Sequence, residues 1–507
     1  MHIAGSLDAD WERVQRCMEQ SAGVGRFLKF FSLTMATQGC LLVNQVVLLP
    51  IELRVWGTDT VAQWVVLIAI ANLVGISDLG LRNAGHSQLL LSVRSGDLAA
   101  SREFKETWAL ARTLIMGITT VFLAHQLWAG ASSSALLSVI TISVAFDTLT
   151  LVRGAWLDTL GHFNKIEALY LGMIASRVAL SLIALATFRA SPAVLSFIWL
   201  LTSIGWMVAQ AVLLRTPASL AFFAGNYRDL RLRSLEAVWF VVSEPAANWT
   251  RISLPLVVFA VFAPPAFITT YVAIRAIFAS ARQVIGQIAR YTSVRYVQRL
   301  EDGKACADHI ALRAIFACTI IGVVVSSAII ADHGRLLRIW LGSANVQADT
   351  FITASFVVGA IAFGYQVIAG VMIRSGDVMS VAKQHYAYLG VCAAAALFVS
   401  IGVRSTSMYL MSLAAQEVVI AGLFVTALGN HVRRGSITAA AVACGALGLL
   451  WVTVTLDTLG LFSANSFGAI AGSFIAATLT AGLVTAILIL ADLLHKRRRE
   501  TSKLQGA

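Results

Sequence analysis

The chain has 507 residues, of which 58% are hydrophobic and 13% are charged, and its mean hydropathy is +0.79. A soluble protein of this length needs more polar residues to cover its surface. The composition therefore excludes a soluble globular protein and predicts a multi-pass membrane protein. The net charge of +12 suits contact with anionic lipid head groups and does not require a nucleic-acid partner.

The first residues, 1–25, mix acidic and basic side chains without an early apolar run, which predicts a cytoplasmic amphipathic arm rather than a cleavable signal peptide. A helix that crosses a hydrocarbon layer about 30 Å thick needs roughly 20 apolar residues. Fourteen such runs follow, at residues 28–50, 61–80, 106–126, 133–154, 166–187, 193–214, 237–262, 266–289, 310–331, 351–373, 384–403, 406–428, 437–457 and 466–491. The sequence thus predicts an all-α polytopic membrane protein with about fourteen transmembrane helices.

Positive charge is distributed unevenly between alternate connections of these helices. Of the 38 Lys and Arg residues, 28 fall in the set of segments that includes both chain ends, and 5 fall in the opposite set. Cationic residues accumulate on the cytoplasmic side of a membrane. We therefore expect both termini to be cytoplasmic. The six cysteines are not spaced as in metal or redox motifs, so no metal ion or cofactor is expected.

Five arginines lie inside the predicted helices, and each costs about 2.5–3.5 kcal/mol if it faces lipid at mid-membrane. They are Arg112, Arg177, Arg251, Arg275 and Arg282. They need a water-filled cavity or a buried partner. One interpretation is a cationic vestibule for a phosphate-bearing cargo, lined by Arg177, Arg251, Arg275 and Arg282.

The alternative interpretation of these arginines is structural. In it, Asp147 neutralises Arg177 and Glu244 neutralises Arg251, while Arg112 and Arg282 extend to the cytoplasmic surface. Both interpretations remain open at this stage.

Three acidic residues lie within the predicted helices, namely Asp147, Glu244 and Glu417. A mid-membrane carboxylate can exchange a proton or bind sodium, so one or more of them could couple transport to an ion. A purely structural role is an equally good interpretation.

Proline is rare, with 7 residues in the chain, yet Pro245 and Pro255 both fall in helix 7 and predict a break there. Pro50 closes helix 1, and the segment from Asn44 to Pro50 is echoed six helices later by the segment from Asn248 to Pro255. We treat Pro50, Pro245 and Pro255 as candidate bending positions.

Such an internal repeat is common in transporters and predicts two six-helix lobes. The expected divisions are an N-lobe at 26–214, a cytoplasmic linker at 215–236, a C-lobe at 237–429, two further helices at 430–492 and a basic tail at 493–507.

The stretch from Leu49 to Gly85 reads LPIELRVWGTDTVAQWVVLIAIANLVGISDLGLRNAG, and a turn rich in small residues runs from Gly154 to Gly161. With the helix number and the duplication, these motifs resemble Wzx-type polysaccharide flippases. That family belongs to the multidrug/oligosaccharidyl-lipid/polysaccharide exporter superfamily. The similarity is close over helices 1 to 5 and loose elsewhere, and many Wzx proteins have twelve helices rather than fourteen.

The resemblance implies two lobes that form a V, as in MATE transporters, and alternate between inward-open and outward-open states in a bacterial inner membrane. It implies transport rather than enzymatic chemistry. The cargo would be an undecaprenyl-diphosphate-linked oligosaccharide, with its diphosphate among the cavity arginines. Membrane lipids, and polysaccharide polymerase and chain-length proteins, are the further partners that it suggests.

Three alternatives remain open. A lipid II flippase fits the helix count. A cation-coupled multidrug exporter commonly carries an acidic residue inside helix 1, and residues 28–50 contain none. A membrane glycosyltransferase or polymerase would need an acidic site on a larger outer loop than the one from Asp332 to Thr350.

The charge distribution predicts that residues 332–350 are periplasmic and residues 290–310 are cytoplasmic. In spheroplasts, an impermeant thiol reagent should label a Ser343→Cys variant from outside. The same reagent should not label a Gly303→Cys variant, and labelling there would overturn the topology.

Overall fold

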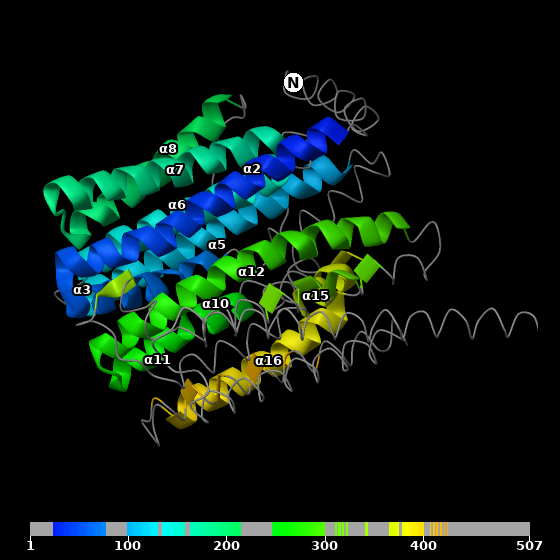
Figure 1. The fold of residues 1–507 in the computed structure, drawn as a ribbon. Helices are drawn as coiled ribbons and strands as arrows, with labels where there is room; N and C mark the ends of the chain where they lie inside the picture. Colours follow the sequence, from blue (N-terminus) through cyan, green and yellow to red (C-terminus); the bar gives the residue numbers. More distant parts are fainter. Residues whose placement is uncertain are drawn as a thin grey trace, which may run out of the picture. The chain divides into compact units, whose positions relative to one another are not determined.

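The computed structural model describes residues 24–77, 99–129, 134–157, 163–213, 246–299, 365–374 and 378–399, with isolated positions between 310 and 342 and between 406 and 423. Every regular element in this part of the chain is a helix (Figure 1). The predictions for the arm up to residue 23, the linker and the last two helices lie outside the described residues, as does the tail. The chain divides into two units, Met1–Thr269 and Thr270–Ala507.

Several helices of the first unit are long and apolar enough to cross a membrane. Among the described residues they are Ser32–Ile76, Ala135–Gly154, Asn164–Phe188 and Pro192–Leu213. A multi-pass membrane fold is therefore confirmed, whereas the total of fourteen helices is not tested by the part of the chain that the structure describes.

The first of these segments is too long for a single crossing. It consists of α2 (Val24–Val43), the π-helical turn η1 (Asn44–Leu48) and α3 (Leu49–Ala71). Inside α3, Gly57 has φ 78° and ψ 170° and interrupts the helix. The first helix was expected to end at Pro50, but it continues past this residue as far as Trp56. Proline is tolerated there because it occupies the first turn of α3.

Four further helices complete most of the first unit. They are α5 (Ala99–Ala129), α6 (Ser134–Leu157), α7 (Phe163–Phe188) and α8 (Pro192–Leu213), within a few residues of prediction apart from the longer α5. Helix α6 packs against α5 and α8, and α7 packs against α2 and α8 (Figure 1). Small residues permit close approach of membrane helices. A side chain at Gly154 of α6, for example, would meet Gln210 of α8 at 3.6 Å.

The break predicted in helix 7 is present. Helix α10 (Ala247–Ile252) and α11 (Leu254–Phe262) are separated at Ser253. Pro255 lies in the first turn of α11 and has no N–H to donate to the carbonyl of Arg251. Both echoed segments of the sequence therefore contain a helix irregularity shortly before their proline, η1 before Pro50 and Ser253 before Pro255. Pro245 lies outside the described residues.

The second unit is described in part. Helix α12 (Pro265–Arg299) begins at the end of the first unit and continues into the second. Helices α15 (Tyr365–Arg374) and α16 (Val378–Phe398) pack together. A side chain at Gly370 of α15 would meet Ser293 Cβ at 3.6 Å, so α15 also lies against α12.

The backbone at Gly57 generates a stability prediction. A Cβ there would meet no heavy atom within 4 Å, so any cost of Gly57→Ala arises from its backbone conformation, about 1–3 kcal/mol. We expect a lower midpoint of thermal unfolding in detergent. Gly117→Ala is the control, because this helical glycine also has open space around it. Equal midpoints for the two variants would contradict the prediction.

Candidate functional site

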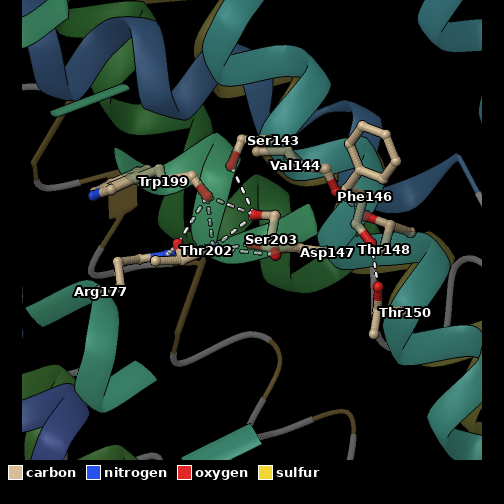
Figure 2. Close-up of polar contacts among 10 residues, drawn as sticks. All are labelled: Ser143, Val144, Phe146, Asp147, Thr148, Thr150, Arg177, Trp199, Thr202 and Ser203. Atoms are coloured by element: carbon tan, nitrogen blue, oxygen red, sulfur yellow. Dashed lines mark hydrogen bonds and ion pairs between the residues drawn. The ribbon is translucent and has the colours of Figure 1, made fainter. Parts of the chain in front are cut away.

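A partly buried ion pair joins two helices of the first unit. Arg177 of α7 donates through Nη1 to Asp147 Oδ2 at 3.0 Å and through Nη2 to Asp147 Oδ1 at 3.2 Å (Figure 2). The two side chains are 13% and 22% exposed. The two-pronged geometry matches the planar fork of arginine to the carboxylate.

Arginine 177 is also held by α8. Its Nε donates to Thr202 Oγ1 at 3.1 Å, and its Nη2 donates to Ser203 Oγ at 2.7 Å and to the carbonyl of Trp199 at 3.4 Å (Figure 2). The guanidinium lies 5.5 Å from the ring centre of Trp199, within the range of a cation–π interaction. Ser203 Oγ is in turn hydrogen-bonded to Ser143 Oγ of α6 at 3.0 Å. One side chain therefore connects α6, α7 and α8.

The structural interpretation of Arg177 is thus present in the fold. Its positive charge is balanced by Asp147, and each of its three guanidinium nitrogens donates at least one hydrogen bond. Binding of a cargo phosphate by Arg177 remains a prediction, and it would require this ion pair to open.

A row of tryptophans continues from the arginine. The ring of Trp199 lies edge-on to the ring of Trp64 of α3, with 5.3 Å between the ring centres. The rings of Trp64 and Trp56 are also edge-on, with 5.8 Å between their centres. Trp56 Nε1 donates to the carbonyl of Ala190, in the turn between α7 and α8, at 2.7 Å. The two parts of α3 are thereby attached to α8 and to the turn that precedes it.

The other predicted cargo-binding arginines lie elsewhere. Arg251 is in the last turn of α10 and half-buried. Arg275 and Arg282 are half-buried on α12, two turns apart on one face as expected. Buried Tyr271 precedes Arg275 by one turn on that face. Arg112, expected to extend to the surface, is instead buried at 6% exposure.

The predicted coupling acids have different environments. Asp147 is paired with Arg177, and Glu244 lies outside the described residues. Glu417 is buried at 8% exposure. It follows Gln416, whose Oε1 accepts from Cys392 Sγ at 2.9 Å. Among the described residues, no group of three His, Cys, Asp or Glu side chains could hold a metal ion.

Glu52 is a buried acidic residue that the sequence did not indicate, because it falls between the predicted helices 28–50 and 61–80. Helix α3 continues the first helix through Pro50, and Glu52 is 7% exposed. The first helix therefore contains an acidic residue. Because helix 1 does not end at Pro50, the lack of an acidic residue in 28–50 does not count against a cation-coupled exporter.

Comparison with known proteins shows similarity of fold. No protein-family model matches the sequence, and no curated protein matches it. A solved lipid II flippase, MurJ in an inward closed conformation, aligns with 92% of this chain and 99% of its own, at a TM-score of 0.62 and 12% identity. The eukaryotic MATE transporter AtDTX14 aligns with 83% of this chain and 99% of its own, at a TM-score of 0.50 and 11% identity.

An inward-facing multidrug resistance MATE family transporter of the MOP superfamily aligns with 81% of this chain and 95% of its own, at a TM-score of 0.50 and 13% identity. This chain shares the fold of these solved structures. The proteins that it resembles are transporters rather than enzymes. The fold expected from the sequence is confirmed, whereas membership of the Wzx branch remains a prediction.

The ion pair predicts an asymmetry between single and double substitutions. Asp147→Asn should destabilise the protein by about 3–5 kcal/mol, because it leaves the arginine charge buried without its partner. The double variant Arg177→Met, Asp147→Leu should recover most of this loss. Thermal unfolding in detergent measures both.

Asp59→Asn is the matched control, because Asp59 is exposed and its loss should change stability by about 0.5 kcal/mol or less. A double variant no more stable than Asp147→Asn would show that the two charges do not depend on each other.

Proposed function

We propose that this protein is a flippase that moves undecaprenyl-diphosphate-linked oligosaccharide from the cytoplasmic to the periplasmic leaflet of a bacterial inner membrane. The main support is the likeness to a lipid II flippase fold over 92% of this chain and 99% of that one. The motifs from Leu49 to Gly85 favour a polysaccharide cargo within this fold.

In this proposal the cargo's diphosphate is bound by Arg251, Arg275 and Arg282. A phosphate taken out of water needs fixed positive charge, and arginine can hold two phosphate oxygens at once. Arg177 contributes only in a state in which Asp147 releases it. The sugars occupy an aqueous cavity and the polyprenyl chain remains in the bilayer, while polymerase and chain-length proteins receive the product.

Two related functions have specific support. A lipid II-type flippase is favoured by the TM-score of 0.62 to MurJ, against 0.50 for the two MATE proteins. A cation-coupled exporter is favoured by the buried acidic residue Glu52 in the first helix.

Deletion of the gene separates these functions. A polysaccharide flippase predicts that one undecaprenyl-linked oligosaccharide accumulates on the cytoplasmic leaflet, as measured by lipid mass spectrometry after selective labelling of each leaflet. Accumulation of lipid II would favour a lipid II-type flippase. Unchanged lipids, together with increased retention of cationic dyes in the cells, would favour a cation-coupled exporter.

Arginine 275 provides the test of cargo binding. Arg275→Ala should reduce export about tenfold or more, since each lost charge-assisted hydrogen bond is worth about 1.5–3 kcal/mol. Arg275→Lys should recover part of it, because lysine keeps the charge but loses the fork. Arg54→Ala, at an exposed position, is the control. Full export by Arg275→Ala at normal protein levels would contradict the proposed role.

A further inference from the structure

One face of α8 carries buried polar atoms that have no hydrogen-bond partner in the described part of the chain. Gln210 is 0% exposed, and neither its Nε2 nor its Oε1 atom has a partner. Trp206 is 4% exposed, and its Nε1 atom also has none. The two residues are four apart and therefore lie on the same face of the helix. Most buried polar atoms in proteins have a partner, so these atoms indicate a ligand.

Three helices enclose these atoms. A Cβ atom at Gly154 of α6 would lie 3.6 Å from Gln210 Nε2 and 3.4 Å from Ile166 Cγ2 of α7. The ring of Trp206 lies against the ring of Tyr170 of α7, with 5.2 Å between the ring centres. Helices α6, α7 and α8 pack side by side (Figure 1). The Gln210 amide is thus inside the helix bundle and not in contact with lipid.

A further buried acceptor lies at this end of the three helices. Asn164, in the first turn of α7, is two residues before Ile166. Its Oδ1 atom is buried and has no partner among the described residues. The unpartnered atoms therefore come from more than one helix.

The hydrogen-bonding character of these atoms restricts the ligand. Gln210 Oε1 accepts a hydrogen bond, whereas Gln210 Nε2 and Trp206 Nε1 donate one. A simple anion cannot donate to the amide oxygen, and a metal cation cannot accept from an N–H group. The ligand must therefore both donate and accept. It must also be small, because Gln210 is fully enclosed.

Water meets these requirements. Buried water molecules typically make about three hydrogen bonds to polar groups that lack other partners. We propose that one or more water molecules bind between α6, α7 and α8, hydrogen-bonded to Gln210 and Trp206, and that Gly154 leaves space for them beside the Gln210 amide. This assigns a role to the glycine that begins the turn rich in small residues at Gly154 to Gly161. The proposal does not depend on the cargo or on transport.

The water site continues the polar face of α8 on which Arg177 is bound. Ser203 on this face accepts from Arg177 Nη2 at 2.7 Å. Gln210 follows Ser203 by seven residues, or about 10 Å along the helix. The buried face of α8 is thus bonded to a protein side chain near its middle and to water near its end.

X-ray footprinting detects such water in the purified full chain. Irradiation converts water into hydroxyl radicals, which oxidise adjacent side chains, and peptide mass spectrometry locates the oxidised residues. We expect oxidation of Trp206 that persists when a radical scavenger is added to the bulk solvent. Trp64 is the control for burial, since it is buried in the tryptophan row and should remain unmodified.

Trp128 is the control for bulk solvent, because it is exposed and the scavenger should suppress its oxidation. Either of two results would overturn the proposal. Trp206 could remain unmodified, as Trp64 does, or its oxidation could be suppressed by the scavenger, as that of Trp128 is.

Substitution of Gly154 tests the space beside the amide. Gly172→Ala, at a helical position of α7 with open space around it, should raise the midpoint of thermal unfolding by roughly 1–4 °C. Gly154→Ala should not raise it, because the methyl group displaces water and leaves Gln210 Nε2 without a partner. Gly154→Ser should unfold at a higher temperature than Gly154→Ala, because its hydroxyl group can donate and accept in place of water. An equal rise for Gly154→Ala and Gly172→Ala would contradict the proposal.

A second background separates displaced water from poor packing. Gln210→Met keeps the length of the side chain and removes both amide atoms. In this background Gly154→Ala should raise the midpoint as Gly172→Ala does, because no amide is left without a partner. If Gly154→Ala remains unfavourable in Gln210→Met, packing alone excludes the methyl group and the proposed role of Gly154 is wrong.

Discussion

The interior of the first unit depends on the ion pair between Arg177 and Asp147. An arginine within the bilayer opposes insertion by a few kcal/mol. Here a carboxylate, two hydroxyls and one carbonyl accept the hydrogen bonds that Arg177 donates. Because these groups belong to α6 and α8, the cost is offset only when three helices are correctly packed. The tryptophan row extends the same constraint to α3 through Trp199, Trp64 and Trp56.

Irregular backbone occurs at corresponding places in the two echoed segments. A membrane helix must satisfy its backbone groups internally or against protein, so an interruption is tolerated where other helices surround it. Leu48 and Pro50 beside η1 are buried, as are Ser253 and Pro255 at the second interruption. Trp249 Nε1 donates to the carbonyl of Ala69 at 3.0 Å, which attaches α10 to α3. These segments combine weakened helices with strong side-chain contacts, a combination suited to a change of shape.

The sequence by itself determined the membrane class, the approximate helix positions in the described part, the break before Pro255 and Asp147 as the candidate partner of Arg177, because apolar run length, proline and buried charge act locally. Only the tertiary structure decided that this ion pair forms, and that Trp56 bonds to Ala190 across 134 residues. It also placed Glu52 inside a helix and away from water. Contacts between distant segments leave no periodic signal along the chain, and a proline that ends one helix cannot be told from sequence apart from a proline that begins the next.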